Sequence, residues 1–533
     1  MNLTSAKRLR QWMRRATACL ATLSMAAAFA ACSPVGGTGD PAVSNTTAAT
    51  STGTAAGSDA YNLAIFTPAD GITLSNNTPI NKWAVLTSDI QKAVKDAAAD
   101  SSETAANVTT KTSTATDLDK QSQDVEDYVV SHLADTNAMA STTLIVAPVS
   151  QTDEVTRQYG DYVRQDVTWN AEPVDGETDQ QKTQRQAGER LVSALTLAHE
   201  AGARVVILSN QLQGFTPDLY VPFTTAKAIG HIQAEQLARK LKLDATSPQN
   251  PKSIEVMIPL SSTGADGNGT VDTTFAQEAF AGIWEVLGPY FSDGRAVSPS
   301  GYLSSATTDD DWKAVTFDPS SDDAAGRELT RRLGNSQATN ASQLKHIDGI
   351  IAMNDYVSSQ VVTALTDLGY TGSSADINPE ISISGIVGSL TGKIDLSKRA
   401  VPSPRKAPSP SPGASASSGI KLPFSSTNDV SSATAWPIVT GYGAYADTIT
   451  HIVNGKQWMT ALANRKDTAT LLAKVVAAYA ANDDPSQIDG LTAADYQGTS
   501  VAAIVKDQLA VAASNLKTML IDTGYITPAD AGL

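Results

Sequence analysis

Residues 142–150 (TTLIVAPVS) and 189–211 (ERLVSALTLAHEAGARVVILSNQ) decide the fold class of this chain. The first stretch is a continuous apolar run of strand length. The second is a helix-like segment that stops at Gly202 and is followed by another apolar run. A buried strand, a helix and a second buried strand in this order form a βαβ unit, in which the two strands are parallel. The two stretches therefore predict a parallel sheet covered by helices.

The same alternation of short apolar runs and helix-like segments extends in both directions along the chain. One set runs from Tyr61 to about residue 225, and a second set runs from 254–260 (IEVMIPL) to 380–386 (EISISGI). Two sets of this size favour two lobes over one very large sheet. In open α/β sheets the ligand lies at the carboxyl ends of the strands, so the residues that follow each strand are the candidates for a binding site.

Residues 1–31 have the features of a signal peptide. A basic stretch from Lys7 to Arg15 precedes the apolar run 16–31 (ATACLATLSMAAAFAA), which ends at Cys32. This order is typical of secretion, and the run is short for a membrane span. Because 29–32 (FAAC) resembles a bacterial lipobox, we expect Cys32 to be lipidated and to anchor an extracytoplasmic protein to the outer face of the cell membrane. A plain secreted protein with an incidental cysteine, or an uncleaved anchor, are the alternatives.

The composition of the chain predicts the character of two segments outside the helix and strand pattern and argues against one class of partner. Residues 32–58 begin with the cysteine and are rich in Ser, Thr, Gly and Ala, which predicts a flexible tether. The formal charge of −16, from 39 basic and 55 acidic residues, argues against nucleic acid as a partner, because phosphate binding needs clustered Lys and Arg. A Pro- and Ser-rich insertion at about 395–430, with a few basic residues, is either a solvated surface insertion or a contact with anionic cell-wall polymer.

The stretch 436–483 carries the clearest likeness to a known family. Its matching residues are Val439-Thr440-Gly441, Gly455, Gln457, Met459-Thr460 and Leu472-Ala473. They fall in register with a motif of the sugar-binding lipoproteins of bacterial ABC importers, so the chain resembles the xylose- and ribose-binding type of the type 1 periplasmic binding protein family. Further segments agree in the same order along the chain: 81–89 (NKWAVLTSD), 144–151 (LIVAPVSQ), 199–211 (HEAGARVVILSNQ), 350–355 (IIAMND) and 515–527 (NLKTMLIDTGYIT).

This resemblance implies both a fold and a function. The fold would be α/β, with two Rossmann-like lobes whose parallel sheets are joined by a multi-strand hinge. Residues 59–225 and about 443–463 would form the N-terminal lobe, and residues 226–442 and about 464–533 the C-terminal lobe. The protein, expected to be a monomer, would close on a sugar between the lobes and deliver it to an ABC permease.

Candidate ligand-binding residues follow from positions after the predicted strands. A sugar site needs planar hydrogen-bonding groups for the hydroxyls and aromatic rings for the C–H faces of the sugar. Trp83 also fits a helix packed in the core, and Asn354 also fits a helix cap. The candidates are Phe66, Thr67, Trp83, Gln151, Ser209 and Asn210 in the N-terminal lobe, and Asp266, Asn268, Asn354, Asp355 and Tyr442 in the C-terminal lobe.

The chain departs from the family at two places. Ser209-Asn210 stand where relatives carry Asp-Arg, and Tyr442-Gly443 stand where relatives carry Gln-Asp, unless Ile386-Val387 are the equivalent residues. Fewer charged hydrogen bonds to sugar hydroxyls put a free pentose in doubt. A larger or modified sugar, or a non-sugar ligand, fits a site rebuilt from amides, hydroxyls and rings.

The loop 264–272 (GADGNGTVD) raises the question of a metal site. As a calcium loop it fails at both ends, because Gly264 has no side chain and Phe275 stands where a bidentate Glu belongs. We expect it instead to form one wall of a solute pocket, through Asp266 or Asn268. The chain has no nucleophile or phosphate-loop motif and its histidines are scattered, so no catalytic residue, metal or cofactor is predicted. The alternative function is a ligand-sensing or cell-wall-associated lipoprotein with the same fold.

Overall fold

The computed structural model describes residues 61–71, 78–101, 107–113, 117–150, 154–170, 172–262, 271–334, 344–375 and 434–531 of the 533-residue chain. Several sequence predictions lie outside these residues: the signal peptide, Cys32 and its tether, the insertion at about 395–430, and the site candidates Gln151, Asp266 and Asn268. Within the described residues, no helix is both long and apolar enough to cross a membrane.

The N-terminal lobe is built on a seven-stranded sheet of order β13-β14-β5-β4-β3-β1-β2. Its neighbouring strands are parallel except for the β13–β14 hairpin at one edge. Helices cover both faces of the sheet, so β3 and most of β4 are buried apolar runs. The strands are β1 (Asn62–Pro68), β2 (Asn107–Ser113), β3 (Thr142–Val146), β4 (Arg204–Leu208), β5 (Leu219–Val221), β13 (Thr492–Tyr496) and β14 (Thr499–Ala503).

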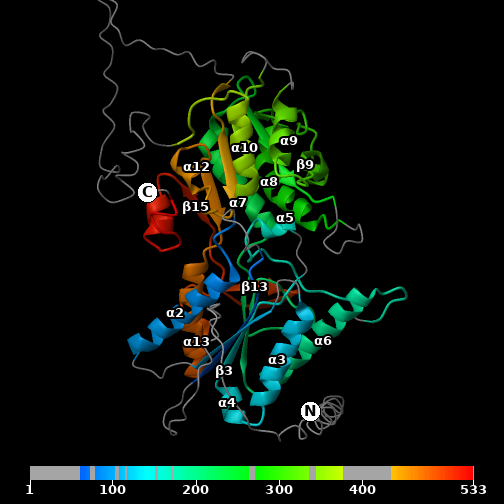
Figure 1. Cartoon of the computed structure of the whole chain (residues 1–533), viewed down its shortest axis with the longest axis vertical. Helices are drawn as coiled ribbons and strands as arrows, with labels where there is room; N and C mark the ends of the chain where they lie inside the picture. Colours follow the sequence, from blue (N-terminus) through cyan, green and yellow to red (C-terminus); the bar gives the residue numbers. More distant parts are fainter. Residues whose placement is uncertain are drawn as a thin grey trace, which may run out of the picture. The chain divides into compact units, whose positions relative to one another are not determined.

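Two helix layers enclose this sheet (Figure 1). α3 and α6 pack on one face over a core that includes Val125 and Leu191, and α2 and α13 pack on the other over a core that includes Ile90 and Leu472. The helices of this lobe are α2 (Trp83–Ser101), α3 (Leu118–His132), α4 (Thr136–Ala140), α5 (Glu154–Arg157), α6 (Asp179–Glu200) and α13 (Arg465–Ala480), with the 3-10 turn η6 (Pro485–Gln487).

The C-terminal lobe repeats this plan on a six-stranded sheet of order β15-β12-β11-β10-β6-β8. Only the β12–β15 pair of this sheet is antiparallel. β7 and β9 form a separate parallel pair. The strands are β6 (Lys252–Val256), β7 (Ile258–Pro259), β8 (Ala296–Val297), β9 (Thr316–Phe317), β10 (Gly349–Ile351), β11 (Ile438–Tyr442), β12 (Met459–Leu462) and β15 (Leu509–Ala512).

The helices of this lobe also form two layers, with α7 packed on α8 and α9 packed on α10. α10 begins where Asn354 Oδ1 accepts a hydrogen bond from the Val357 N–H at 2.8 Å, which is an N-cap. The helices are α7 (Ala226–Leu241), α8 (Thr274–Ser292), α9 (Ala324–Leu333), α10 (Asp355–Asp367) and α12 (Ile449–Val453), with η1 (Leu243–Ala245), η2 (Asp309–Val315) and η7 (Lys517–Ile521) as short turns.

The chain crosses between the lobes three times, through residues 222–225, 463–464 and 504–508. Two of these crossings are joined by a hydrogen bond from Gln508 Nε2 to Thr224 Oγ1 at 2.8 Å. The third is held by Asn81, just before α2, whose Nδ2 donates to the Ala463 carbonyl at 2.9 Å. The predicted α/β fold with two lobes and largely parallel sheets is therefore confirmed.

The structure corrects the expected division of the last hundred residues. Residues 443–463 were assigned to the N-terminal lobe, but β12 pairs with β11 in the C-terminal sheet. Residues 464–533 were assigned to the C-terminal lobe, but α13 packs on α2, and β14 pairs with β5. The pattern of a single apolar run cannot show which of two similar sheets it will join, because that depends on its hydrogen bonds to other strands, which for β14 lie nearly three hundred residues away.

Candidate ligand site

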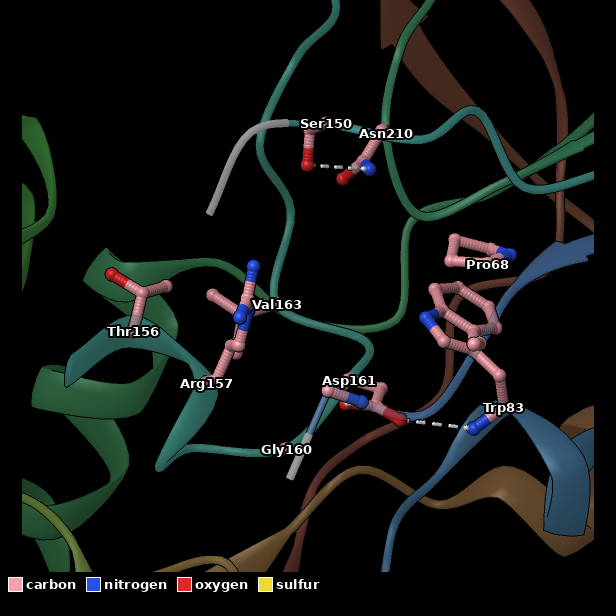
Figure 2. A pocket seen from close by; sticks show the side chains of 11 residues that line it. Pro68, Trp83, Ser150, Thr156, Arg157, Gly160, Asp161, Val163 and Asn210 are labelled. Atoms are coloured by element: carbon pink, nitrogen blue, oxygen red, sulfur yellow. Dashed lines mark hydrogen bonds between the residues drawn. The ribbon is translucent and has the colours of Figure 1, made fainter. Parts of the chain in front are cut away.

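A narrow pocket with a cavity volume of about 30 Å³, open in part to solvent, lies at the carboxyl ends of three neighbouring strands of the N-terminal lobe (Figure 2). The pocket is formed by residues at the ends of β1, β3 and β4, by the first residue of α2, and by the segment from α5 to residue 163. This is the position at which open α/β sheets bind ligands. The lining residues are Pro68, Ala69, Gly71, Trp83, Ser150, Thr156, Arg157, Gly160, Asp161, Val163 and Asn210.

Asp161 is the acidic group of this pocket, and it was not among the residues chosen from the sequence. Its Oδ1 accepts a hydrogen bond from the Gly71 N–H, and its Oδ2 accepts one from the Trp83 N–H, both at 3.1 Å. Because Trp83 is the first residue of α2, Asp161 caps this helix from another part of the chain (Figure 2). Burial raises the pKa of Asp161 to about 7, against the opposite effect of the two N–H donors, and the nearby Asp70 adds to the rise.

Arg157 brings a positive charge to the same pocket. The carbons of its side chain lie next to Gly71, where a Cβ would stand 3.0 Å from Arg157 Cδ. Within the described residues, Arg157 and Asp161 form no ion pair with each other, and neither forms one with a third residue. The pocket therefore holds one cation and one carboxylate whose charges are not neutralised by a direct partner.

Asn210, which was predicted as a ligand contact, does line the pocket. Its Nδ2 donates to the Pro148 carbonyl at 2.8 Å and to Ser150 Oγ at 3.2 Å, and its Oδ1 accepts from the Gln165 N–H at 2.7 Å. These contacts fix the orientation of the amide. Its neighbour Ser209 faces elsewhere, since Ser209 Oγ donates to the Tyr162 carbonyl at 3.0 Å and the residue is 1% exposed.

Trp83 has both of the roles that the sequence left open. Its ring packs against Tyr162, with centroids 5.1 Å apart and an interplanar angle of 61°, so most of the indole belongs to the core. The part that remains exposed borders the pocket. Phe66 and Thr67, by contrast, are buried and do not line it. Phe66 packs edge-on against Tyr128 in the core beneath α3.

The candidates of the C-terminal lobe lie together, but they contact protein groups. Asp355 is buried and accepts hydrogen bonds from Gln457 Nε2 at 2.7 Å, Thr460 Oγ1 at 2.8 Å and the Tyr445 N–H at 3.1 Å. Burial raises its pKa to about 6. Asp355 thus ties the start of α10 to Gln457, to β12 and to the turn after β11, because its carboxylate accepts a hydrogen bond from each of them.

A segment of the N-terminal lobe covers Asn354 and Tyr442. Tyr159 is 2% exposed within the core of the C-terminal lobe, where its ring lies 4.4 Å from that of Phe275 and 6.4 Å from that of Tyr442. Gln158 accepts a hydrogen bond from Asn354 Nδ2 at 3.1 Å. The structure therefore brings Trp83 and Asn210 into one pocket but separates them from the C-terminal candidates by residues 158–159.

One signal in the sequence could have found this arrangement. Residues 147–178, between β3 and α6, are longer than a connection in a βαβ unit needs to be, since αβ and βα loops commonly have about 2–6 residues. This connection includes the stretch 159–166 (YGDYVRQD), in which aromatic and charged residues are concentrated. Long connections that carry such residues are often functional.

The fold and the pocket define a class of protein, namely a two-lobed α/β protein with three interlobe crossings and a pocket at the strand ends. No family model and no curated protein matches the chain. It is similar to a carbohydrate transporter solute-binding protein from Chloroflexus aurantiacus in complex with D-glucose (17% identity, 88% of this chain and 97% of that chain, TM-score 0.46). It is also similar to an ABC transporter solute-binding protein from Clostridium phytofermentans with bound β-D-glucose (17%, 88% and 99%, 0.46) and to a periplasmic ribose ABC transporter protein from Conexibacter woesei (13%, 87% and 96%, 0.43).

Proposed function

We propose that this chain is an extracytoplasmic solute-binding lipoprotein that captures a sugar by closure of its two lobes and delivers it to an ABC permease. The position of the pocket carries the proposal. Asp161, Arg157 and Asn210 converge at the carboxyl ends of β1, β3 and β4, together with one edge of an indole ring. The collinear motifs of the sequence, from 81–89 to 515–527, support the same function.

Closure of the lobes would be coupled to the ligand through residues 154–163. This segment lines the pocket of the N-terminal lobe at Arg157 and Asp161, and it contacts the C-terminal lobe at Gln158 and Tyr159. A ligand that contacts the segment more favourably in one interlobe arrangement shifts the population toward that arrangement. The three crossing segments supply the hinge.

A thermal-shift screen tests the sugar assignment. Binding to the native state alone raises the melting temperature, so mono- and oligosaccharides are compared with amino acids and short peptides on residues 59–533. A shift with carbohydrates is expected. If only another solute class raises the melting temperature, the ligand is not a sugar. For the carbohydrate that binds, Asn210→Ala should weaken binding by about 1–3 kcal/mol, because a buried ligand group loses its hydrogen-bond partner.

Anchoring by lipid is tested separately at Cys32. The Cys32→Ala variant should be recovered in the medium or the soluble fraction, whereas the wild type stays with the membrane. Equal retention of both proteins would contradict lipidation at this residue.

A ligand-sensing lipoprotein with the same fold is the second candidate, and one observation favours it. The polar residues Asn354 and Asp355 contact the chain itself, so contact between the ligand and the C-terminal lobe would be indirect. Reconstitution with the cognate permease separates the two candidates. An importer component should stimulate the ATPase of that permease in a ligand-dependent way, and a sensor should not.

A further inference from the structure

Asp161 is a carboxylate whose charge has no partner in the described part of the chain. Each of its oxygens accepts one backbone N–H, from Gly71 and from Trp83, and no lysine or arginine lies within ion-pair distance. Carboxylates that are largely removed from water are rarely left without a cation, because the cost of desolvation is then not compensated. The exposed part of this group borders the pocket, where it can accept a hydrogen bond from a cationic group of a ligand.

The surroundings of Asp161 suit a small ammonium group. The indole of Trp83 borders the same end of the pocket, and ammonium groups are attracted to indole rings as well as to carboxylates (Figure 2). Asp70 raises the pKa of Asp161 and Lys82 lowers it, so one negative and one positive charge act on this carboxyl from nearby. Arg157 is the opposing charge in the pocket. It forms no ion pair with Asp161 and is not among the groups that shift the pKa of Asp161 most.

Uncharged hydrogen-bonding groups line the rest of the pocket. Ser150, Thr156 and Asn210 border it with two hydroxyls and an amide, all of which also have partners within the chain, and Arg157 adds the donors of its guanidinium. Such groups match hydroxyl oxygens. A ligand that satisfies both parts of the pocket carries one ammonium group on a polyhydroxylated frame.

We propose, building on the proposed function, that the ligand is an amino sugar whose protonated amine pairs with Asp161 while its hydroxyls contact the Ser150–Asn210 side of the pocket. The charge-assisted hydrogen bond to the carboxylate then gives most of the selectivity over neutral sugars.

Calorimetric titration of the mature chain at pH 7 with glucosamine, glucose and N-acetylglucosamine tests the proposal. Glucosamine should bind at least about 10-fold more tightly than either neutral sugar, and the preference should shrink at high salt. A neutral sugar that binds as tightly as glucosamine overturns the amine inference and leaves the sugar-binding function standing. If none of these or other carbohydrates binds, the proposed function itself fails.

Two variants separate the charge of Asp161 from its role as a helix cap. Asp161→Asn keeps one acceptor for the backbone but removes the charge, so the preference for glucosamine should fall to about 1. Arg157→Gln removes the opposing charge from the same pocket and should keep or increase the preference. A purely structural role of Asp161 would lower the melting temperature of the Asn variant without changing the ratio of the affinities, and that result would also overturn the proposal.

Discussion

Asn354 Nδ2 donates a 3.1 Å hydrogen bond to Gln158 Oε1, and this bond joins the first residue before α10 in the C-terminal lobe to the long β3–α6 connection of the N-terminal lobe. Beside it, the hydroxyl of Tyr445 donates to the Gln158 carbonyl at 2.6 Å. An amide predicted to hold a ligand therefore holds another part of its own chain. The same amide caps α10 through Oδ1, so its two ends serve different purposes.

Gln158→Ala should favour separation of the lobes while leaving the α10 cap intact. Loss of one side-chain hydrogen bond changes the equilibrium between lobe arrangements by about 0.5–1.5 kcal/mol. The radius of gyration from small-angle scattering should rise. Asn354→Ala removes the cap as well, so its free energy of unfolding should fall by about a further 0.5–2 kcal/mol. Equal unfolding free energies for the two variants would contradict the division of roles.

Asp355 should make the stability of the protein depend on pH in one direction. Burial raises its folded pKa to about 6, whereas an aspartate in an unfolded chain titrates near 3.9. Between these values the folded state binds the proton more tightly, so the contribution of Asp355 to the unfolding free energy falls as the pH rises, by up to about 1.4 kcal/mol per pH unit. Above about pH 6 the contribution is constant.

Urea unfolding of the wild type and of Asp355→Asn at several pH values isolates this effect. The wild-type value minus the variant value should decrease between about pH 4 and pH 6 and then level off. Asp161, whose pKa is also raised, is present in both proteins, so its contribution cancels in the difference. A difference that stays flat over this range would mean that Asp355 is not buried as the structure has it.

Alanine at Gly230 or Gly282 should destabilise the C-terminal lobe. A Cβ at Gly230 would lie 2.1 Å from the Ala279 carbonyl oxygen, and a Cβ at Gly282 would lie 2.0 Å from the Lys227 carbonyl oxygen. Both distances are far below van der Waals contact, so α7 and α8 would have to move apart, at a cost of about 1–3 kcal/mol for each substitution.

Gly326→Ala in α9 is the matched control for these variants. The nearest atom to a Cβ there is the Gln360 carbonyl oxygen at 3.4 Å, and alanine favours helices over glycine by up to about 1 kcal/mol. Thermal unfolding should therefore place this variant at or above the wild type and the other two below it. The prediction fails if all three alanines have the same effect.

Arg332 should be far more important for stability than its neighbour Arg331. The guanidinium of Arg332 is fully buried, pairs with Glu255 at 3.3 Å and Glu328 at 2.7 Å, and donates to two backbone carbonyls. Arg332→Met leaves Glu255 buried without its cation, which costs about 3–5 kcal/mol. Arg331 is largely exposed, so Arg331→Met should cost about 0–1 kcal/mol. Urea unfolding measures both, and similar losses would contradict the assignment.

The extent to which the sequence predicted the fold and the site can be judged from particular residues. The runs 142–146 and 204–208 are strands as predicted, and Gly202 follows the end of α6, since apolar period and glycine position are local properties. Trp83 and Asn210 line the pocket at the strand ends because Trp83 begins α2 and Asn210 follows β4, two elements that were predicted at these positions. Asp161 was missed because no short motif marks a carboxylate that acts through the backbone of Gly71 and Trp83.

The sequence by itself determined the class of the fold, the existence of two α/β sets, and the order of the segments that resemble sugar-binding lipoproteins. These features are set by hydrophobic period and turn chemistry within about twenty residues. Only the tertiary structure decided which sheet β12, β14 and β15 join, and that Gln158 and Tyr159 occupy the face formed by Asn354 and Tyr442. Such choices depend on hydrogen bonds and packing between different elements, some of them nearly two hundred or more positions apart, and local patterns carry no record of them.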